Sequence, residues 1–186
     1  MTPATPRPCS PIAAVTVARS LVGTGVYMLG TGNYSTPLDG PSDCFGFAFC
    51  RCYGVPRHRP GFNRGPWASV EDDLNCNSAI EDADHNRELF VRADRPELGD
   101  LIAYPTIHLA DHPQPWIGHI AIVVNVTRVL EWDPELPDWS LLDVAQCCGP
   151  NGRKPGILRT DGSHWNGHDM TWPKPEHRTS LLRVVP

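Results

Sequence analysis

Prolines and glycines interrupt this chain so often that no long regular element fits between them. The sequence holds 20 prolines and 16 glycines in 186 residues. Proline cannot continue a helix interior or a central strand, and glycine weakens both. The pattern therefore predicts a loop-rich protein of short elements and argues against a helical bundle. The length suits one domain with a real core, since single domains commonly contain roughly 100–200 residues.

The charge pattern predicts no nucleic-acid partner, and the hydropathy pattern predicts no membrane span. The net charge is -5, and lysine and arginine are scattered along the chain rather than clustered. No apolar run is long enough to cross a bilayer. Residues 1–11 contain no apolar signal-peptide core, and the apolar segment 12–22 is interrupted by Thr16, Arg19 and Ser20. We therefore expect a protein that is made in the cytoplasm without a Sec signal.

The order of the expected elements indicates an α+β fold. Residues 1–11 are predicted to form a disordered arm, and residues 12–186 are predicted to form a single domain. We expect helices over 11–21 and 43–53, one or two surface helices within 66–90, and strands over 98–104, 117–126, 139–147, 156–159 and 180–185. Helices that precede several antiparallel strands are typical of a fold with the helices on one side of a sheet.

The segment 43–53 carries four aromatic residues, which would ordinarily favour a strand. It follows a Gly-Pro-Ser turn and ends at Gly54, and it is mostly apolar. We interpret it as a buried helix, with Ser42 or Asp43 as its N-cap.

The seven cysteines do not form the pattern of a disulfide scaffold or a zinc ribbon. Their odd number leaves at least one without a partner in the chain. The clusters at 50–52 and 147–148 are too tightly spaced for a zinc knuckle, although a disulfide between the clusters stays open. The histidines and tryptophans of segment 163–177 are interpreted as a loop at the rim of a cleft rather than as a metal site. We therefore expect no metal and no other cofactor.

Cys44 and His119 are the residues that indicate chemistry. Cys44 lies at the predicted start of the buried helix, where free N–H groups and the helix dipole lower a thiol pKa. A thiolate nucleophile needs a nearby base, which is usually histidine. His119 follows Gly118 and opens the apolar run 119–124, so it is expected on a rigid strand. The two residues therefore predict a cysteine nucleophile with a histidine base.

The next predicted strand offers a third member for this pair. Asp143 is the acid within the apolar run 141–146 and could accept a hydrogen bond from the second imidazole nitrogen of His119. Gln146 is the alternative third member, and it lies on the opposite face of the strand from Asp143 by two-residue alternation. Asp143 is the preferred prediction at this point.

Four segments, in this order along the chain, resemble the NlpC-type cysteine peptidases. They are Tyr-Met-Leu-Gly at 27–30, Asp-Cys-Phe-Gly-Phe at 43–47, Pro-Glu-Leu-Gly-Asp-Leu at 96–101 and Gly-His-Ile-Ala-Ile at 118–122. The family is related to the CHAP amidases within the papain-like superfamily, and the resemblance covers roughly residues 12–148. Each segment is short, and the specificity comes from all four occurring in order.

The resemblance implies a papain-like α+β fold and a role for each matched residue. Cys44 would attack a carbonyl carbon, His119 would transfer the proton, and Asp143 aligns with the third polar residue of the family. Tyr27 would help to hold the oxyanion, and Asp43 aligns with an acid that holds a free substrate amine in some relatives. Phe45 stands where the family usually has serine, which departs from the amine-binding arrangement.

The expected function is hydrolysis of amide bonds in the peptide part of bacterial peptidoglycan, through a thioester on Cys44. Without a Sec signal, a holin-assisted phage endolysin or an effector toxin delivered by a secretion system fits best, acting on the cell wall or in the periplasm. Such a protein could have an immunity or delivery protein as partner. The alternatives are a deamidase or transglutaminase-like effector acting on a protein amide, and a non-catalytic binding module on the same fold.

Overall fold

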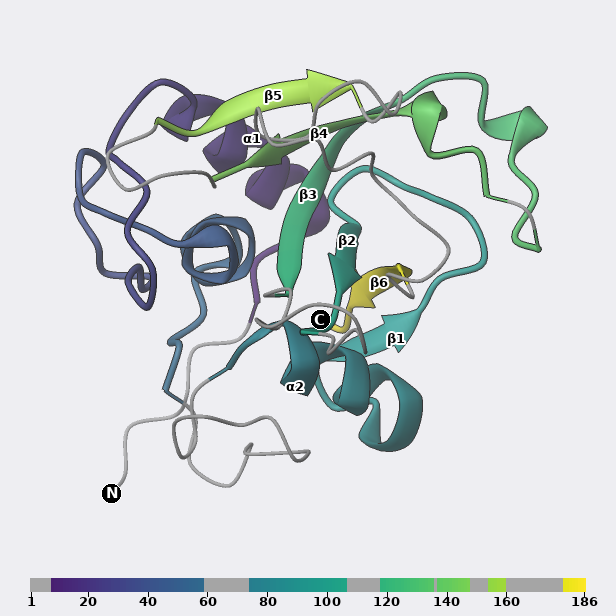
Figure 1. Ribbon diagram of the computed structural model, residues 1–186, viewed down its shortest axis with the longest axis horizontal. Coiled ribbons are helices and arrows are strands. Elements are labelled where there is room, and N and C mark those ends of the chain that lie inside the picture. The colour runs from purple at the N-terminus through teal and green to yellow at the C-terminus, as the bar shows by residue number, and fades with distance from the viewer. Residues whose placement is uncertain (1–7, 59–73, 107–117, 136, 148–153, 160–178) are drawn as a thin grey trace, which may run out of the picture.

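A six-stranded antiparallel sheet forms the centre of the molecule in the computed structural model (Figure 1). The structure describes residues 8–58, 74–106, 118–135, 137–147, 154–159 and 179–186. The strands are β1 (Phe90–Arg92), β2 (Leu101–Tyr104), β3 (His119–Val126), β4 (Leu142–Gln146), β5 (Gly156–Arg159) and β6 (Ser180–Val184), in the order β1-β6-β2-β3-β4-β5. All neighbouring pairs are antiparallel. The α+β class predicted from the sequence is confirmed.

The helices are short and precede most of the strands. They are α1 (Pro11–Leu21), the π-helical segment η1 (Gly46–Arg51), α2 (Cys76–Glu81) and the π-helical segment η2 (Asp82–Asn86), and the β3–β4 connection adds the 3₁₀ turns η3 (Val129–Glu131) and η4 (Trp139–Leu141). Among the described residues, none of these helices is long and apolar enough to cross a bilayer.

The two faces of the sheet bury different groups of side chains, as the alternation along β3 shows. Ile120, Ile122 and Val124 pack into a large cluster with α1 and the helix containing η1. Ala121 and Val123 point the other way, into a smaller cluster that includes Trp132 from the β3–β4 connection. Figure 1 shows α1 and the coil that contains η1 beside β3 and β4. Burial on both faces explains why β3 is an almost uninterrupted apolar run.

The aromatic segment 43–53 is helical because it is buried on all sides. Residues 44–45 and 52–53 continue the helix at the two ends of η1. Phe47 and Phe49 are fully buried, so their large side chains contribute core packing that outweighs the strand preference of aromatic residues. The backbone N–H of Cys52 bonds to the carbonyl of Phe47, five residues earlier, so the middle of the helix is widened.

Arg51 stabilises the loop of residues 37–42, which precedes this helix. Its guanidinium donates to the carbonyls of Pro37, Leu38 and Gly40 and to the hydroxyl of Ser42, at 2.7–3.2 Å. The side chain is buried, so these four acceptors replace the water that a charged group otherwise requires. The loop that leads to Cys44 is thereby held against the helix.

The boundaries of several predicted elements differ from those observed. The strand expected over 98–104 begins at Leu101, and the one expected over 139–147 begins as a 3₁₀ turn before β4. β1 was not predicted, because three residues next to an acidic stretch carry little strand signal. Its backbone is held by buried Asp82, whose carboxylate accepts from the N–H groups of Leu89 and Phe90 at 2.8 and 2.9 Å.

The predicted arm is ordered from Cys9 onward. The N–H of Cys9 donates to the carbonyl of Tyr53 at 2.9 Å, and the Ser10 hydroxyl caps α1 by accepting from the N–H of Ala13. Pro11 opens α1, where its missing N–H costs nothing. The part of the arm prediction that concerns residues 1–7 lies outside the described residues.

Candidate functional site

Cys44 is the first residue of the buried helix, as the sequence predicted. Asp43 is its N-cap: the carboxylate accepts from the N–H of Gly46 at 2.7 Å, and the carbonyl accepts from the N–H of Phe47 at 2.9 Å. The N–H groups of a first helical turn have no partner within the helix. The backbone N–H of Cys44 is therefore available to stabilise negative charge beside its own side chain.

Gly46 allows the loop before the helix to approach it closely. A Cβ atom at this position would lie 2.3 Å from the carbonyl oxygen of Thr31. The same stretch of loop accepts a hydrogen bond from the N–H of Asp43 at 2.9 Å, again through Thr31. The glycine of the Asp-Cys-Phe-Gly segment is thus required by packing, and this packing fixes the direction in which the helix starts.

His119 occupies the first position of β3, opposite Tyr104 of β2. The residue before it, Gly118, has no room for a side chain, because a Cβ there would lie 2.8 Å from both the Thr106 nitrogen and the Tyr104 oxygen. The charge of the His119 side chain and a hydrogen bond from it lower the pKa of the Cys44 thiol, so the imidazole lies beside the sulfur. The structure therefore brings together the two residues that sequence analysis proposed as nucleophile and base.

Gln146, at the end of β4, contacts the other side of the imidazole. Nε2 of His119 lies 3.0 Å from Oε1 of Gln146, and both side chains are buried. An amide oxygen can only accept, so this contact places a proton on Nε2. Nδ1 is then the ring nitrogen left to exchange a proton with Cys44. Cys44, His119 and Gln146 therefore form a continuous chain of contacts.

Asp143, the preferred third member, does not lie beside His119. The register of the β3–β4 ladder places it opposite Asn125, and its carboxylate accepts from the Asn125 amide at 2.8 Å. Six positions of β3 separate Asn125 from His119, which corresponds to about 20 Å along the strand. The side chain beside His119 is therefore not that of Asp143 but that of Gln146, the alternative that the sequence had left open.

A second thiol, Cys76, lies against the nucleophile. It donates a hydrogen bond to the sulfur of Cys44, and both residues are buried, with exposed fractions of 6% and 8%. This hydrogen bond lowers the pKa of Cys44 well below its ordinary value, although burial opposes it. The charge and hydrogen bond of His119 and the backbone N–H of Ile120 lower it further. For Cys76 the hydrogen bond to Cys44 and burial raise the pKa, and the charge of Arg57, which lowers it, does not offset them. Cys44 is therefore the member of the pair that ionises.

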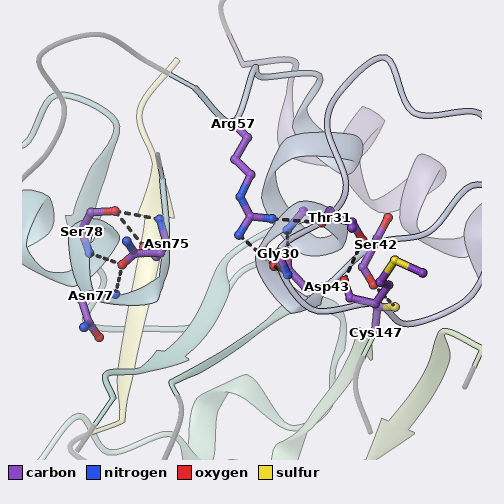
Figure 2. Close-up of polar contacts among 11 residues, drawn as sticks. Gly30, Thr31, Ser42, Asp43, Arg57, Asn75, Asn77, Ser78 and Cys147 are labelled. Atoms are coloured by element: carbon purple, nitrogen blue, oxygen red, sulfur yellow. Dashed lines mark hydrogen bonds and ion pairs between the residues drawn. The ribbon is translucent and has the colours of Figure 1, made fainter. Parts of the chain in front are cut away.

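The Asp43 carboxylate is occupied by the protein itself. Besides capping the helix, it accepts from the N–H of Gly30 at 3.0 Å and forms an ion pair with Arg57 at 2.8 Å (Figure 2). Burial and the negative charge of Cys44 raise the pKa of Asp43, while Arg57 opposes them. Asp43 is 3% exposed, and both of its oxygens have partners. This geometry gives it a structural role and does not fit the role of holding a free substrate amine.

Tyr27 lies on the strand-like segment next to the nucleophile loop. It forms an isolated parallel bridge with Ser42, two residues before Cys44, and its side chain packs partly against the core. The neighbouring bonds are the N–H of Met28 to the carbonyl of Ser42 and the N–H of Ser42 to the carbonyl of Val26. Its backbone is therefore close to the site, and its role toward an oxyanion stays a prediction.

Two residues of the site were missed by sequence reasoning. Cys76 lies in an acidic stretch that was interpreted as a solvated helix, and no local pattern connects it with Cys44. Arg57 lies in a basic loop, and the only available signal was that a buried Asp beside a nucleophile needs a cationic partner. The histidine- and tryptophan-rich segment 163–177 lies outside the described residues. Within the described part of the chain, no three His, Cys, Asp or Glu side chains are arranged to hold a metal ion.

Comparisons of the chain with protein-family models, with curated proteins and with solved structures found no match.

Proposed function

We propose that this chain is a cysteine hydrolase of amide bonds, with Cys44 as nucleophile, His119 as general base and acid, and Gln146 as the residue that orients the imidazole. The observation that carries the proposal is the chain of hydrogen bonds from Cys44 through His119 to Gln146. A buried thiol with a lowered pKa beside a histidine on a rigid strand is the arrangement that nucleophilic catalysis requires.

Each residue of this chain has a distinct step in the reaction. The Cys44 thiolate attacks the carbonyl carbon, and the oxyanion that forms is stabilised by the backbone N–H of Cys44, with Tyr27 as a further candidate donor. His119 then protonates the departing amine, which leaves a thioester on Cys44. A water molecule gives its proton to His119 as it attacks the thioester, and the carboxylic acid is released.

The neutral amide of Gln146 suits this sequence of proton transfers. It accepts the Nε2 proton of His119 and so keeps Nδ1 directed at the sulfur. Because it carries no charge, it orients the ring without adding another anion to the Cys44 thiolate and the nearby Asp43 carboxylate. An amide in the third position is also known from the Cys-His-Asn sites of papain-like proteases.

The substrate class that we propose is the peptide part of bacterial peptidoglycan, and the fold that we propose is the papain-like one. Both extend the resemblance of the four segments to NlpC-type peptidases. The α+β order, with the nucleophile on a helix and the base on the sheet, supports the fold. The engagement of Asp43 by Arg57 favours a substrate that does not present a free amine to that carboxylate. Delivery by a holin or a secretion system, and an immunity partner, belong to the same proposal.

The test is the release of new amino groups from purified peptidoglycan by the wild type and by Cys44→Ala, with the masses of the products. We expect release by the wild type alone, and the product masses identify the bond that is cleaved. Cys147→Ser is a matched control, because Cys147 is also buried but donates its thiol proton to the carbonyl of Ser42.

Each other result redirects the proposal in a defined way. Equal release by the wild type and Cys44→Ala would exclude Cys44 as the nucleophile. No release from peptidoglycan, together with Cys44-dependent ammonia release from glutamine-containing proteins, would replace the substrate class with a protein amide. No Cys44-dependent turnover of either substrate would favour the non-catalytic binding module.

A further inference from the structure

Cys76 is a buried thiol that takes no step in the proposed hydrolysis, although it lowers the pKa of Cys44. Hydrolysis requires a nucleophile, a base and an oxyanion donor, and none of these is a second thiol. Yet Cys76 is in hydrogen-bond contact with Cys44, although the two residues are 32 positions apart in the chain. Both cysteines are free thiols. A thiol in contact with a thiolate has a chemistry of its own, which is oxidation to a disulfide.

The position of Cys76 is fixed by its helix. It is the first residue of α2, and Asn75 and Ser78 form a reciprocal capping box around it, with bonds of 2.8–3.1 Å (Figure 2). Asn77 then ties the same helical turn to the segment after β2 by accepting from the N–H of Thr106 at 2.8 Å. Cys44 and Cys76 therefore each occupy the first position of a capped helix, and the two helix starts meet at the sulfur atoms.

Three further described cysteines, Cys9, Cys52 and Cys147, are placed differently. Cys9 and Cys147 donate to the carbonyls of Cys52 and Ser42 rather than to a sulfur. Burial raises the pKa of Cys147 to about 12 and that of Cys52 beyond the ordinary range of thiols. Thiols of this kind are chemically inert, since oxidants react with thiolates. The Cys44–Cys76 pair combines a sulfur whose pKa is lowered with a thiol hydrogen-bonded to it.

We propose that Cys44 and Cys76 form a reversible disulfide when a hydroperoxide oxidises Cys44. The pair would then act as a redox-controlled modification site. That the disulfide silences hydrolysis rests on the proposed function, whereas the formation of the disulfide does not.

The reaction balances in two steps. The Cys44 thiolate attacks one oxygen of hydrogen peroxide, the O–O bond breaks, and Cys44 becomes a sulfenic acid while hydroxide leaves and takes up a proton as water. The sulfur of Cys76 then attacks the sulfur of Cys44. The new S–S bond forms as the S–O bond breaks, and the hydroxide leaves as water with the proton of Cys76. Two thiols and one peroxide thus give one disulfide and two waters.

The second step protects the nucleophile. A sulfenic acid without a neighbouring thiol is oxidised further to sulfinic acid, which ordinary thiols do not reduce. With Cys76 in place, a small dithiol can restore both cysteines by exchange. The consequence is a site that is switched off by peroxide and switched on again by a reductant.

The first experiment maps the cysteines of the full chain after exposure to hydrogen peroxide. Remaining thiols are alkylated, the protein is digested with trypsin, and the peptides are identified by mass spectrometry. Cleavage after arginine places Cys44 in peptide 20–51, together with Cys50, and Cys76 in peptide 65–87. We expect these two peptides to be linked and lighter by two hydrogen atoms, with fragmentation assigning the link to Cys44. Dithiothreitol should separate them again.

Variants test whether Cys76 resolves the sulfenic acid. In Cys76→Ser, peroxide should convert Cys44 to the sulfinic and sulfonic acids, and dithiothreitol should not restore the thiol. Cys147→Ser is the control and should form the Cys44–Cys76 link as the wild type does, because the Cys147 thiol is bonded to the carbonyl of Ser42.

Three results would overturn the proposal. They are conversion of wild-type Cys44 to sulfinic acid without a link to Cys76, a link from Cys44 to another cysteine, and a Cys44 that peroxide does not modify while other cysteines of the same sample react. Because the mapping needs no substrate, it gives its answer even where peptidoglycan is not cleaved. The experiments can therefore exclude the hydrolase proposal and the disulfide proposal independently of each other.

Discussion

The two ends of the β3–β4 ladder carry similar polar pairs but differ in what lies next to them. At one end His119 bonds to Gln146, and at the other Asn125 bonds to Asp143. Both pairs join the same two strands, and both are hydrogen-bonded at 2.8–3.0 Å. Only the first pair meets the start of the helix that carries Cys44. The comparison teaches that a strand pair supplies orientation at either end, while the neighbouring helix decides which end has a thiol beside it.

His119→Ala should have the largest effect on this comparison. Loss of the base removes the proton acceptor from Cys44 and the proton donor to the leaving amine, so kcat is expected to fall by roughly 10²–10⁴-fold. The measurement is steady-state kinetics on the amide substrate cleaved by the wild type. A variant that retains most of its kcat would show that this end of the ladder is not catalytic.

Gln146→Ala should have the next largest effect. The imidazole would keep its contact with Cys44 but lose the acceptor that fixes its ring, and misplacement of a catalytic group by about 1 Å can cost roughly 100-fold. We expect the loss in kcat rather than in KM, because Gln146 touches the base and not the substrate. Gln146→Asn, which keeps the amide on a shorter side chain, should recover part of the activity. An unchanged kcat in Gln146→Ala would show that Gln146 does not orient the His119 imidazole during catalysis.

The pH dependence of Cys44 alkylation separates the two ends without any substrate. The pKa of Cys44 lies below the ordinary thiol value, so its reactive thiolate is present at lower pH than in an ordinary cysteine. Iodoacetamide should therefore modify Cys44 at pH values below the usual thiol pKa of about 8.5. Removing a donor or a positive charge raises the pKa, so the reaction midpoint should move to higher pH in Cys76→Ala and in His119→Ala. Asp143→Ala should keep the wild-type midpoint, and a shift there would contradict the assignment.

Asp143→Ala should have the smallest effect on activity. Its carboxylate lies about 20 Å from His119 along the strand, and sites so far apart act independently, so kcat should change by less than about two-fold. The substitution removes the acceptor for the Asn125 amide, which should cost about 1 kcal/mol of the free energy of unfolding. Urea denaturation measures that loss. A drop in kcat comparable to that of Gln146→Ala, with the protein still folded, would restore Asp143 to the site.

The sequence was informative wherever a local pattern had one physical explanation. The helix from Pro11 and the strand from His119 follow from caps, periodicity and β-branched runs, and both are observed close to their predicted bounds. Cys44 and His119 could be chosen because a thiol at a helix start and a histidine at the start of an apolar strand are unusual in themselves. Gly46 and Gly118 are explained only by the structure, since each is required by a backbone segment that packs against it.

What only the tertiary structure decided is which side chains meet. Asp143 and Gln146 differ by three positions on one strand, and alternation showed that they face opposite ways but not which one faces His119. The register of β3 against β4 settled that choice, because it sets which residues are opposite each other and how far along the strand each lies. Cys76 and Arg57 joined the site from separate segments through contacts that no local spacing encodes. A sequence determines its own periodicities and caps, whereas contacts between distant segments depend on how whole elements pack.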